Sequence, residues 1–424
     1  MQRAAAASVT LTGNRKNGLS SHAIDDEIAP STFPAPLILP NDDLSNDPRC
    51  PPQSFRSWTR EKNRNKVTPQ RNVLYVAYPP EVDSDVGYIQ TWCNPNPNKT
   101  SMSGTCSAPK IDDVVLYLGA FYHGMQVKSL PTKLRFTSWE DDPPKLKRAS
   151  SKMKTKIPTR IGLACQTECI GIRARPSPDD VYPAQLNLDD ILEAAIEILP
   201  EDAYAILLLV NHDLYEDDDD EFVCGRAYGA SRISVISTAR YNPALDGIQE
   251  VEREHAWPAS HCQSYIMKCI DASDSTKRPK KKSKVDSDLN VQDDQNATSP
   301  MRAALLAYVN TPPLTNSSPQ DIITGTWLAR VCRTSSHELG HCFGMDHCVY
   351  YACIMQGSGT VIEDVRQPPY LCPVDLAKLL KACGTTEEAQ LGALLVFCER
   401  FPKVQLFMAF AAWIRAKRLI DGGP

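Results

Sequence analysis

The stretch HELGHCFGMDHCVYYACIMQG (337–357) determines how the rest of the chain is interpreted. Its first two histidines, His337 and His341, are four residues apart, so on a helix their side chains face the same way. That spacing lets two imidazoles bind one zinc ion, and Glu338 stands where its carboxylate can reach a metal-bound water. The stretch therefore predicts a zinc site with a carboxylate beside it.

A third protein ligand requires the helix to end soon after His341. Gly344 tolerates the left-handed backbone conformation that reverses a chain after a helix, and His347 then supplies the third ligand. Three neutral histidines leave one position of a tetrahedral zinc ion open for water, which is the arrangement of catalytic sites. We expect Glu338 to act as general base toward that water in the hydrolysis of a peptide bond.

The cysteine content favours metal binding over disulfide bonding. The 424-residue chain has 15 cysteines, an odd number, and its first residues lack the long apolar core of a secretory signal. Reduced thiols, some of which hold metal, are typical of such a chain. We therefore expect an intracellular protein, either cytoplasmic or nuclear.

The segment HELGHCFGMDHC, followed by VYYACIMQG and later by LCPVD, resembles the archaemetzincins, which are zinc-dependent metallopeptidases of the metzincin group. The resemblance extends from about residue 72 to about residue 383. It implies that Cys348, Cys353 and cysteines downstream bind a second, structural zinc ion. It also implies that Met355 is the methionine of the turn beneath the catalytic metal. We accordingly expect two zinc ions per chain, one catalytic and one structural.

The chain departs from the family pattern at its last expected cysteine. Three residues after Cys372, it has Asp375 instead. A carboxylate oxygen can bind zinc, so a site of three cysteines and one aspartate is chemically possible, although harder and weaker than a four-sulfur site. The other interpretation is that Asp375 caps the helix that follows and binds nothing, which leaves three thiols.

The resemblance implies an α+β fold: a metzincin-like mixed twisted sheet with an active-site helix, followed by C-terminal helices from about residue 375. Sequence patterns predict several elements directly. They predict strands at 72–78, 159–165 and 205–210, a helix at 187–200, and the active-site helix from about 324 to 344. The run 114–122 fits either a strand or a buried helix, and the alternation at 232–240 predicts an exposed or edge strand.

Two segments have the composition of disordered chain. Residues 1–70 are rich in Pro, Ser, Asn and Asp without periodicity, so we expect a disordered tail before a single domain at 71–424. Residues 270–299 form an expected flexible insertion that contains KRPKKKSK. This basic run fits either a nuclear-import or polyanion-binding patch, or a charged loop that stays in water.

The expected partners follow from charge and from the peptidase resemblance. A formal net charge of −5 gives no reason to expect nucleic acid, and no apolar run is long enough to cross a membrane. We expect a peptide or protein substrate, extended along the strand near 225–238 by strand addition. Gly225, Tyr228 and Ser231 are the candidate substrate-binding residues.

A rival interpretation is a zinc-stabilised binding or regulatory protein that has little or no peptidase activity. It would act through the basic insertion, with a nuclear-import receptor as a candidate partner. Glu338 argues against this interpretation, because a purely structural zinc site has no use for a general base.

Overall fold

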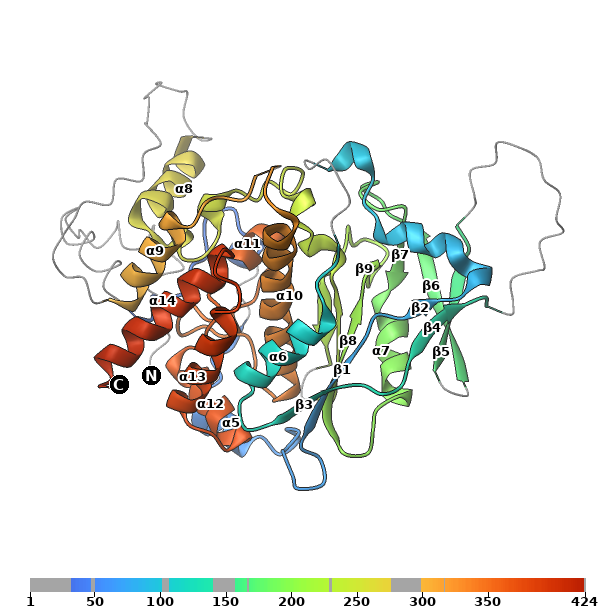
Figure 1. The fold of residues 1–424 in the computed structure, drawn as a ribbon, viewed down its shortest axis with the longest axis horizontal. Helices are drawn as coiled ribbons and strands as arrows, with labels where there is room; N and C mark the ends of the chain where they lie inside the picture. The colour runs from blue at the N-terminus through green and yellow to red at the C-terminus, as the bar shows by residue number, and fades with distance from the viewer. Residues whose placement is uncertain are drawn as a thin grey trace.

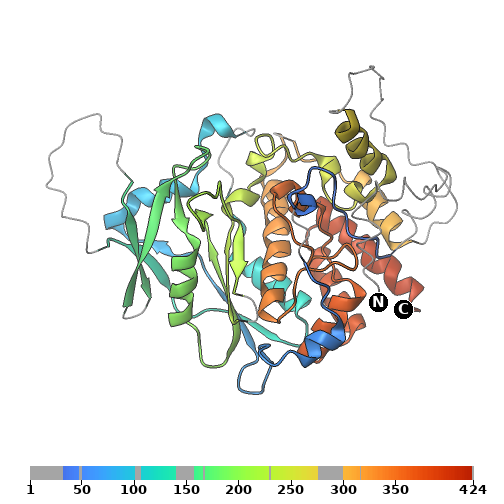
Figure 2. The same cartoon turned by 180° about the vertical axis from the view of Figure 1, so that it is seen from behind.

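The computed structural model describes residues 32–46, 50–100, 107–139, 157–165, 168–228, 231–275, 299–315 and 317–422. Within these residues the chain forms a five-stranded sheet, in the order β10-β11-β8-β1-β3, and a six-stranded sheet, in the order β2-β4-β5-β6-β7-β9. The six-stranded sheet lies at one end of the molecule and the C-terminal helices at the other, with the five-stranded sheet and α10 between them (Figures 1 and 2).

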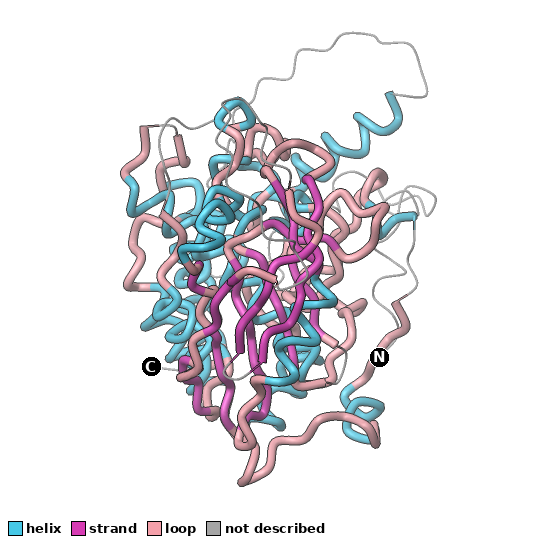
Figure 3. Tube along the Cα trace, turned by 90° about the vertical axis from the view of Figure 1, so that its right-hand side faces the viewer, coloured by secondary structure: helices cyan, strands magenta, loops and turns pink. Residues whose placement is uncertain are grey.

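The five-stranded sheet is mixed. Its strands are β1 (Val73–Ala77), β3 (Gln126–Ser129), β8 (Ala203–Val210), β10 (Gly225–Ala227) and β11 (Ile233–Ser237). β1 pairs in parallel with β3 and β8, β8 pairs in parallel with β11, and only β10 is antiparallel to its neighbour. This arrangement leaves β10 at the edge of the sheet, and the strands twist relative to one another (Figure 3).

The six-stranded sheet and the helices complete the α+β fold that the sequence predicted. The remaining strands are β2 (Glu81–Val82), β4 (Leu134–Thr137), β5 (Arg160–Cys165), β6 (Glu168–Pro176), β7 (Ala184–Asn187) and β9 (Asp213–Tyr215). The α-helices are α4 (Asp43–Asn46), α5 (Phe55–Arg60), α6 (Ile111–Phe121), α7 (Leu188–Glu197), α8 (Gln263–Ser275), α9 (Pro300–Asn310), α10 (Gln320–Cys342), α11 (Val361–Arg366), α12 (Pro373–Cys383), α13 (Glu387–Cys398) and α14 (Gln405–Ile420). None of these described helices is long and apolar enough to cross a membrane.

The run 114–122, left open between strand and helix, lies in helix α6, apart from its last residue. The predicted strands at 72–78, 159–165 and 205–210 and the predicted helix at 187–200 are present as β1, β5, β8 and α7. The active-site helix begins earlier than predicted, at Gln320.

Burial of β8 on both faces explains why the sheet sits at the centre of the fold. Its eight residues, AYAILLLV, are all buried, and from Ala205 onward they alternate between two cores. Ala205, Leu207 and Leu209 pack in the core that contains α10, whereas Ile206, Leu208 and Val210 pack in the core that contains α7. The five-stranded sheet therefore has α10 on one side and α7 on the other.

The prediction of an exposed or edge strand at 232–240 is wrong. β11 lies between β8 and β10, and all five of its residues are buried. Its serines need no solvent, because Ser234 Oγ donates to the Ile206 carbonyl at 3.1 Å and Ser237 Oγ donates to the His212 carbonyl at 2.6 Å. Polar alternation therefore did not mark an exposed face here.

The prediction of a disordered tail over residues 1–70 is wrong for residues 32–46 and 50–70. Leu37 and Leu39 are buried, and the Ala352 amide donates to the Pro34 carbonyl at 2.9 Å. Trp58 of α5 is 1% exposed, and its Nε1 donates to the Phe343 carbonyl at 2.9 Å. Apart from the short helices α4 and α5, most of these segments are irregular in conformation, and contacts with the domain hold them in place. Residues 1–31 lie outside the described residues.

The expected insertion at 270–299 is also only partly described. Residues 270–275 complete helix α8, so the insertion begins later than predicted. The basic run KRPKKKSK lies outside the described residues.

We predict that Trp58→Ala lowers the free energy of unfolding by about 3–5 kcal/mol, because it empties a buried site and removes a hydrogen bond. Phe55→Ala is the matched control on the same helix, where the side chain is 40% exposed, and it should cost less than about 1 kcal/mol. Urea unfolding of both variants measures the difference. Equally small effects would contradict the packing of this segment on the domain.

Candidate active site and metal centres

Helix α10 carries the first histidine pair and is fixed by contacts from two directions. Trp327 Nε1 donates to the Thr238 carbonyl at 2.7 Å, just after β11. The hydroxyl of Tyr122 donates to the Ser336 carbonyl at 2.6 Å, next to the first histidine. The helix ends at Cys342, and Gly344 then adopts a φ of +70°, which confirms the predicted left-handed reversal.

The reversal brings the three predicted histidines together. Ligand nitrogens of His337, His341 and His347 all lie within 4.8 Å of one another. His337 Nε2 is 3.1 Å from His341 Nε2, close to the edge of about 3.4 Å expected for a tetrahedron with zinc–nitrogen bonds of about 2.1 Å. The donor set and its spacing therefore fit a zinc ion.

Backbone carbonyls orient two of these rings. His337 Nδ1 lies 2.6 Å from the Ile354 carbonyl and His341 Nδ1 lies 2.8 Å from the Met345 carbonyl. Because a carbonyl only accepts, each Nδ1 carries the proton and each Nε2 presents its lone pair to the cluster. Burial lowers the pKa of all three histidines, that of His347 to about 4, so the neutral form that binds metal prevails at neutral pH.

Glu338 is buried beside the histidines and is tied to the edge of the sheet. It is 8% exposed, and burial raises the pKa of its carboxyl to about 8, although a hydrogen bond from the Ala227 amide opposes the shift. Ala227 is the last residue of β10. The predicted general base therefore lies directly against the edge strand.

Met355 lies beneath the helix turn that joins the two histidines. It is fully buried, and a Cβ added at Gly340 would collide with its sulfur. The glycine between His337 and His341 is thus what allows the methionine to approach the helix this closely.

The predicted second cluster also comes together. Cys348 Sγ is 3.5 Å from Cys372 Sγ, and Asp375 Oδ2 is 3.5 Å from the sulfurs of both Cys353 and Cys372. All four residues are buried, and their ligand atoms lie within 4.8 Å of one another. A tetrahedron with zinc–sulfur bonds of about 2.3 Å has edges of about 3.8 Å, so these spacings also fit zinc.

Asp375 does not cap helix α12 as the alternative interpretation required. The N-cap position is Cys372, and the second oxygen of Asp375 accepts from Lys378 Nζ at 2.7 Å. Lys378 is 1% exposed, so a buried cation faces the acidic member of the cluster. Desolvation and the neighbouring Cys348 thiol raise the pKa of Asp375 to about 7, whereas Lys378 acts in the opposite direction.

Sequence reasoning missed two residues that connect the clusters, Lys378 and Gln53. Lys378 Nζ donates to Gln53 Oε1 at 2.8 Å, and Gln53 Nε2 donates to the Gly344 carbonyl at 3.0 Å. Cys50, from the same N-terminal segment, places its sulfur 3.9 Å from His347 Nδ1. The spacing of Lys378, one turn after Asp375, was a usable signal, whereas Gln53 and Cys50 stood in a segment that seemed unstructured.

The candidate substrate residues lie on and beside the edge strand. Gly225 begins β10, and a Cβ there would come within 2.7 Å of the Val235 carbonyl. Tyr228 and Ser231 lie at the turn to β11, where the Ser231 amide donates to the Tyr228 carbonyl at 2.8 Å. Ala227 is the residue of β10 that contacts Glu338; Gly225 lies two residues before it and Tyr228 directly after it.

The sequence profile of peptidase family M54 matches residues 322–381, which contain both clusters. Archaemetzincin-2 of Homo sapiens is 25% identical over 351 residues, which are 83% of this chain and 70% of the human protein. The chain is similar to the archaemetzincins over most of its length. This similarity supports a zinc-dependent metallopeptidase as its general function.

Other archaemetzincins are similar over different lengths. Archaemetzincin-2 of Macaca fascicularis is 31% identical over 200 residues, which are 47% of this chain and 42% of the relative. The crystal structure of archaemetzincin from Methanopyrus kandleri is 14% identical and covers 75% of this chain and 98% of its own. Its TM-score is 0.33, below the level from which a shared fold can be argued.

We predict that Gly340→Ala lowers the free energy of unfolding by about 1–3 kcal/mol, because the new methyl group overpacks Met355. Gly392→Ala is the matched control inside helix α13, where a Cβ meets nothing within 4 Å, and it should stabilise the protein by up to about 1 kcal/mol. Urea unfolding gives both values. Stabilisation by both substitutions would show that the methionine does not press against this turn.

Proposed function

We propose that this protein hydrolyses peptide bonds at His337, His341 and His347, with Glu338 as general base. The observation that carries the proposal is the position of Glu338. Glu338 directly follows His337, one of three converging histidines, and its buried carboxyl group accepts a hydrogen bond from the edge strand at Ala227. A structural metal site needs neither a buried carboxylate nor an open strand beside it.

The histidines would hold zinc, which when bound polarises a substrate carbonyl and acidifies a water molecule. Glu338 accepts a proton from the water while the water oxygen forms a bond to the carbonyl carbon. The carboxyl then returns the proton to the amide nitrogen, which departs as an amine when the carbon–nitrogen bond breaks. Burial raises the pKa of the Glu338 carboxyl, which makes it a stronger base than an exposed glutamate.

Edge strand β10 supports binding of an extended substrate. One side of β10 pairs with β11, and its other side has no strand partner among the described residues. A peptide that pairs with the free side by strand addition would pass close to Glu338, because the strand residue Ala227 contacts Glu338. In this proposal Gly225, Tyr228 and Ser231 border the bound chain.

We also propose a second, structural zinc ion bound by Cys348, Cys353, Cys372 and Asp375. Three thiolates and a carboxylate around a divalent ion leave a net charge of −2, and Lys378 would compensate part of it. Because Cys348 follows His347 directly, this ion would fix the segment that brings the third histidine to the catalytic site.

We predict that Glu338→Gln retains zinc but lowers kcat/KM for peptide cleavage by about 10²–10⁴-fold, because the shape of the side chain remains while its basicity is lost. His341→Ala should lose both the catalytic ion and cleavage. A diverse peptide library read by mass spectrometry, with zinc content measured on the same samples, tests both expectations. Cleavage by Glu338→Gln at the parent rate would refute the assigned role.

We predict two zinc ions per chain in the parent protein and one in Cys372→Ala. The remaining ion should still support cleavage in the fraction of Cys372→Ala that stays folded. Cys342→Ala is the control, since this buried cysteine belongs to neither cluster, and it should keep two ions. Elemental analysis of dialysed protein gives the counts, and two ions in Cys372→Ala would contradict the second site.

The rival function, a zinc-stabilised binding protein acting through the basic insertion, predicts a different dependence. Deletion of residues 275–285 would then abolish nuclear import or partner binding, while zinc content and any peptide cleavage persist. That result would show that the insertion directs localisation or partner binding. The catalytic proposal would then still be tested by the Glu338→Gln experiment.

A further inference from the structure

A groove beside the turn between β10 and β11 collects positive charge. It has a volume of about 620 Å³ and is lined by the segment before β1, by residues at the end of α7, and by Tyr228 and residues 231–233. We call this pocket the basic groove. Its cationic lining residues are Lys62, Arg64, Lys66, Arg71 and Arg232. No lining residue is acidic. Such a site attracts anions.

The charges of the basic groove lack counter-ions within the part of the chain that the structure describes. None of the five cations forms an ion pair with a described residue. Arg232 donates to the backbone carbonyls of Pro200 and Ala203, and its Nε is buried without a partner among the described residues. Burial and the nearby charge of Arg71 lower the pKa of Arg232. An anion would relieve this repulsion.

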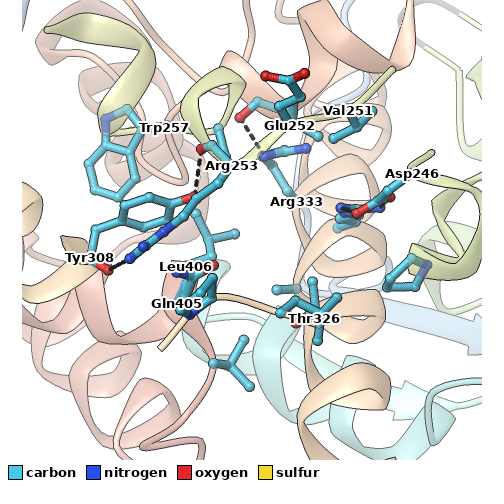
Figure 4. A pocket seen from close by; sticks show the side chains of 18 of the residues that line it. Asp246, Val251, Glu252, Arg253, Trp257, Tyr308, Thr326, Arg333, Gln405 and Leu406 are labelled. Carbon is cyan, nitrogen blue, oxygen red and sulfur yellow. Dashed lines mark hydrogen bonds and ion pairs between the residues drawn. The ribbon is translucent and has the colours of Figure 1, made fainter. Parts of the chain in front are cut away.

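A second pocket, beside α10, also contains cations, but most of these have counter-ions. It has a volume of about 210 Å³ and contains three arginines (Figure 4). Arg330 pairs with Asp246 through both of its terminal nitrogens, at 2.6 and 2.8 Å, and Arg333 pairs with Asp364 at 3.2 Å. Arg253 donates to three backbone carbonyls. Two of its three cations are therefore paired with carboxylates of the protein, whereas none of the cations of the basic groove has a carboxylate partner among the described residues.

The basic groove adjoins the candidate active site on two sides. Tyr228, which lines it, directly follows Ala227, the residue whose amide contacts Glu338. Arg64 packs against Gly344, since a Cβ added there would lie 2.7 Å from its Cγ. A peptide lying along β10 would therefore reach the groove within a few residues of the reacting bond.

Local contacts hold the groove in shape. Arg64 stacks over the Trp58 ring at 3.9 Å from its centroid. Asn65 Nδ2 donates to the Tyr204 carbonyl at 3.0 Å, and the Tyr204 hydroxyl donates to the Asn65 carbonyl at 3.2 Å. The segment that carries Lys62 and Lys66 is thus anchored to the core while both lysines stay exposed.

We propose that the basic groove is a substrate subsite that binds acidic side chains of a peptide lying along β10. The inference rests on the proposed peptidase function and adds a substrate class to it: peptides with Asp or Glu on one side of the cleaved bond. Ile196, Leu199 and Ile233 line the same groove and suit the methylene groups of glutamate. The contact of β10 with Glu338 favours a peptide over a phosphate polyanion as the occupant.

The test compares two labelled decapeptides, (Glu-Gly)₅ and (Gln-Gly)₅, by fluorescence anisotropy on the zinc-loaded full chain carrying Glu338→Gln. We expect (Glu-Gly)₅ to bind at least about fivefold more tightly, and the advantage to shrink as salt is raised. Lys62→Glu/Lys66→Glu should abolish the advantage. Lys128→Glu/Lys403→Glu makes the same change in net charge at exposed lysines outside the groove and should retain it.

Cleavage of the peptide library by the protein with intact Glu338 provides the second readout. We expect acidic residues to be enriched on one side of the cleaved bonds, and the enrichment to disappear in the groove variant only. Cleavage without enrichment, or equal binding of the two decapeptides, overturns the subsite and leaves the peptidase proposal intact. Selective binding of (Glu-Gly)₅ without any cleavage supports an acidic-peptide groove but overturns the peptidase proposal.

One competitor separates the two kinds of anion. If inorganic tripolyphosphate binds the basic groove while both decapeptides bind equally, the site recognises phosphate and the proposal is overturned. Unfolding midpoints of both lysine variants equal to the parent's ensure that a lost preference reflects lost charge.

Discussion

The reversal of the chain at Gly344 is the constraint on which the site depends. A helix can present His337 and His341 on one face, but it cannot supply a third histidine at the same point, because its next turn moves away. A left-handed glycine directly after the helix returns the chain toward its own last turn, and His347 arrives within reach of the other two. The cysteine cluster, Lys378 and Gln53 lie around that returning segment.

Two layers of contact hold it. The cysteine cluster begins one residue after His347, so the loop is fixed from its inner side by buried ligand atoms and by Lys378. From its outer side the N-terminal segment crosses the loop, with Gln53 bonded both to Lys378 and to the Gly344 carbonyl. The two candidate metal sites are therefore connected through the same loop. We expect a structural change at one site to alter the geometry of the other.

The histidine cluster could be predicted because it depends on local spacing, whereas the fold class and the cysteine cluster were expected from the resemblance to the archaemetzincins. Helical offsets place His337 and His341 together, and β8 is apolar on both faces in a way that identifies a central strand. The errors came from long-range contacts. The 32–70 segment carries no periodic pattern, yet Trp58 is buried by residues nearly 300 positions later. In β11 the serine hydroxyls donate to backbone carbonyls, so these serines are buried although the polar and apolar alternation of the sequence suggested an exposed face.

The central claim is that the stretch from His337 to Asp375 holds two zinc ions, one of them beside Glu338. Diffraction from crystals of the protein at the zinc absorption edge tests it directly. The account predicts two anomalous peaks, one among the three histidine rings and one among the three cysteine sulfurs and the Asp375 carboxylate. A single peak, or a histidine cluster without an ion in protein that contains zinc, would contradict it.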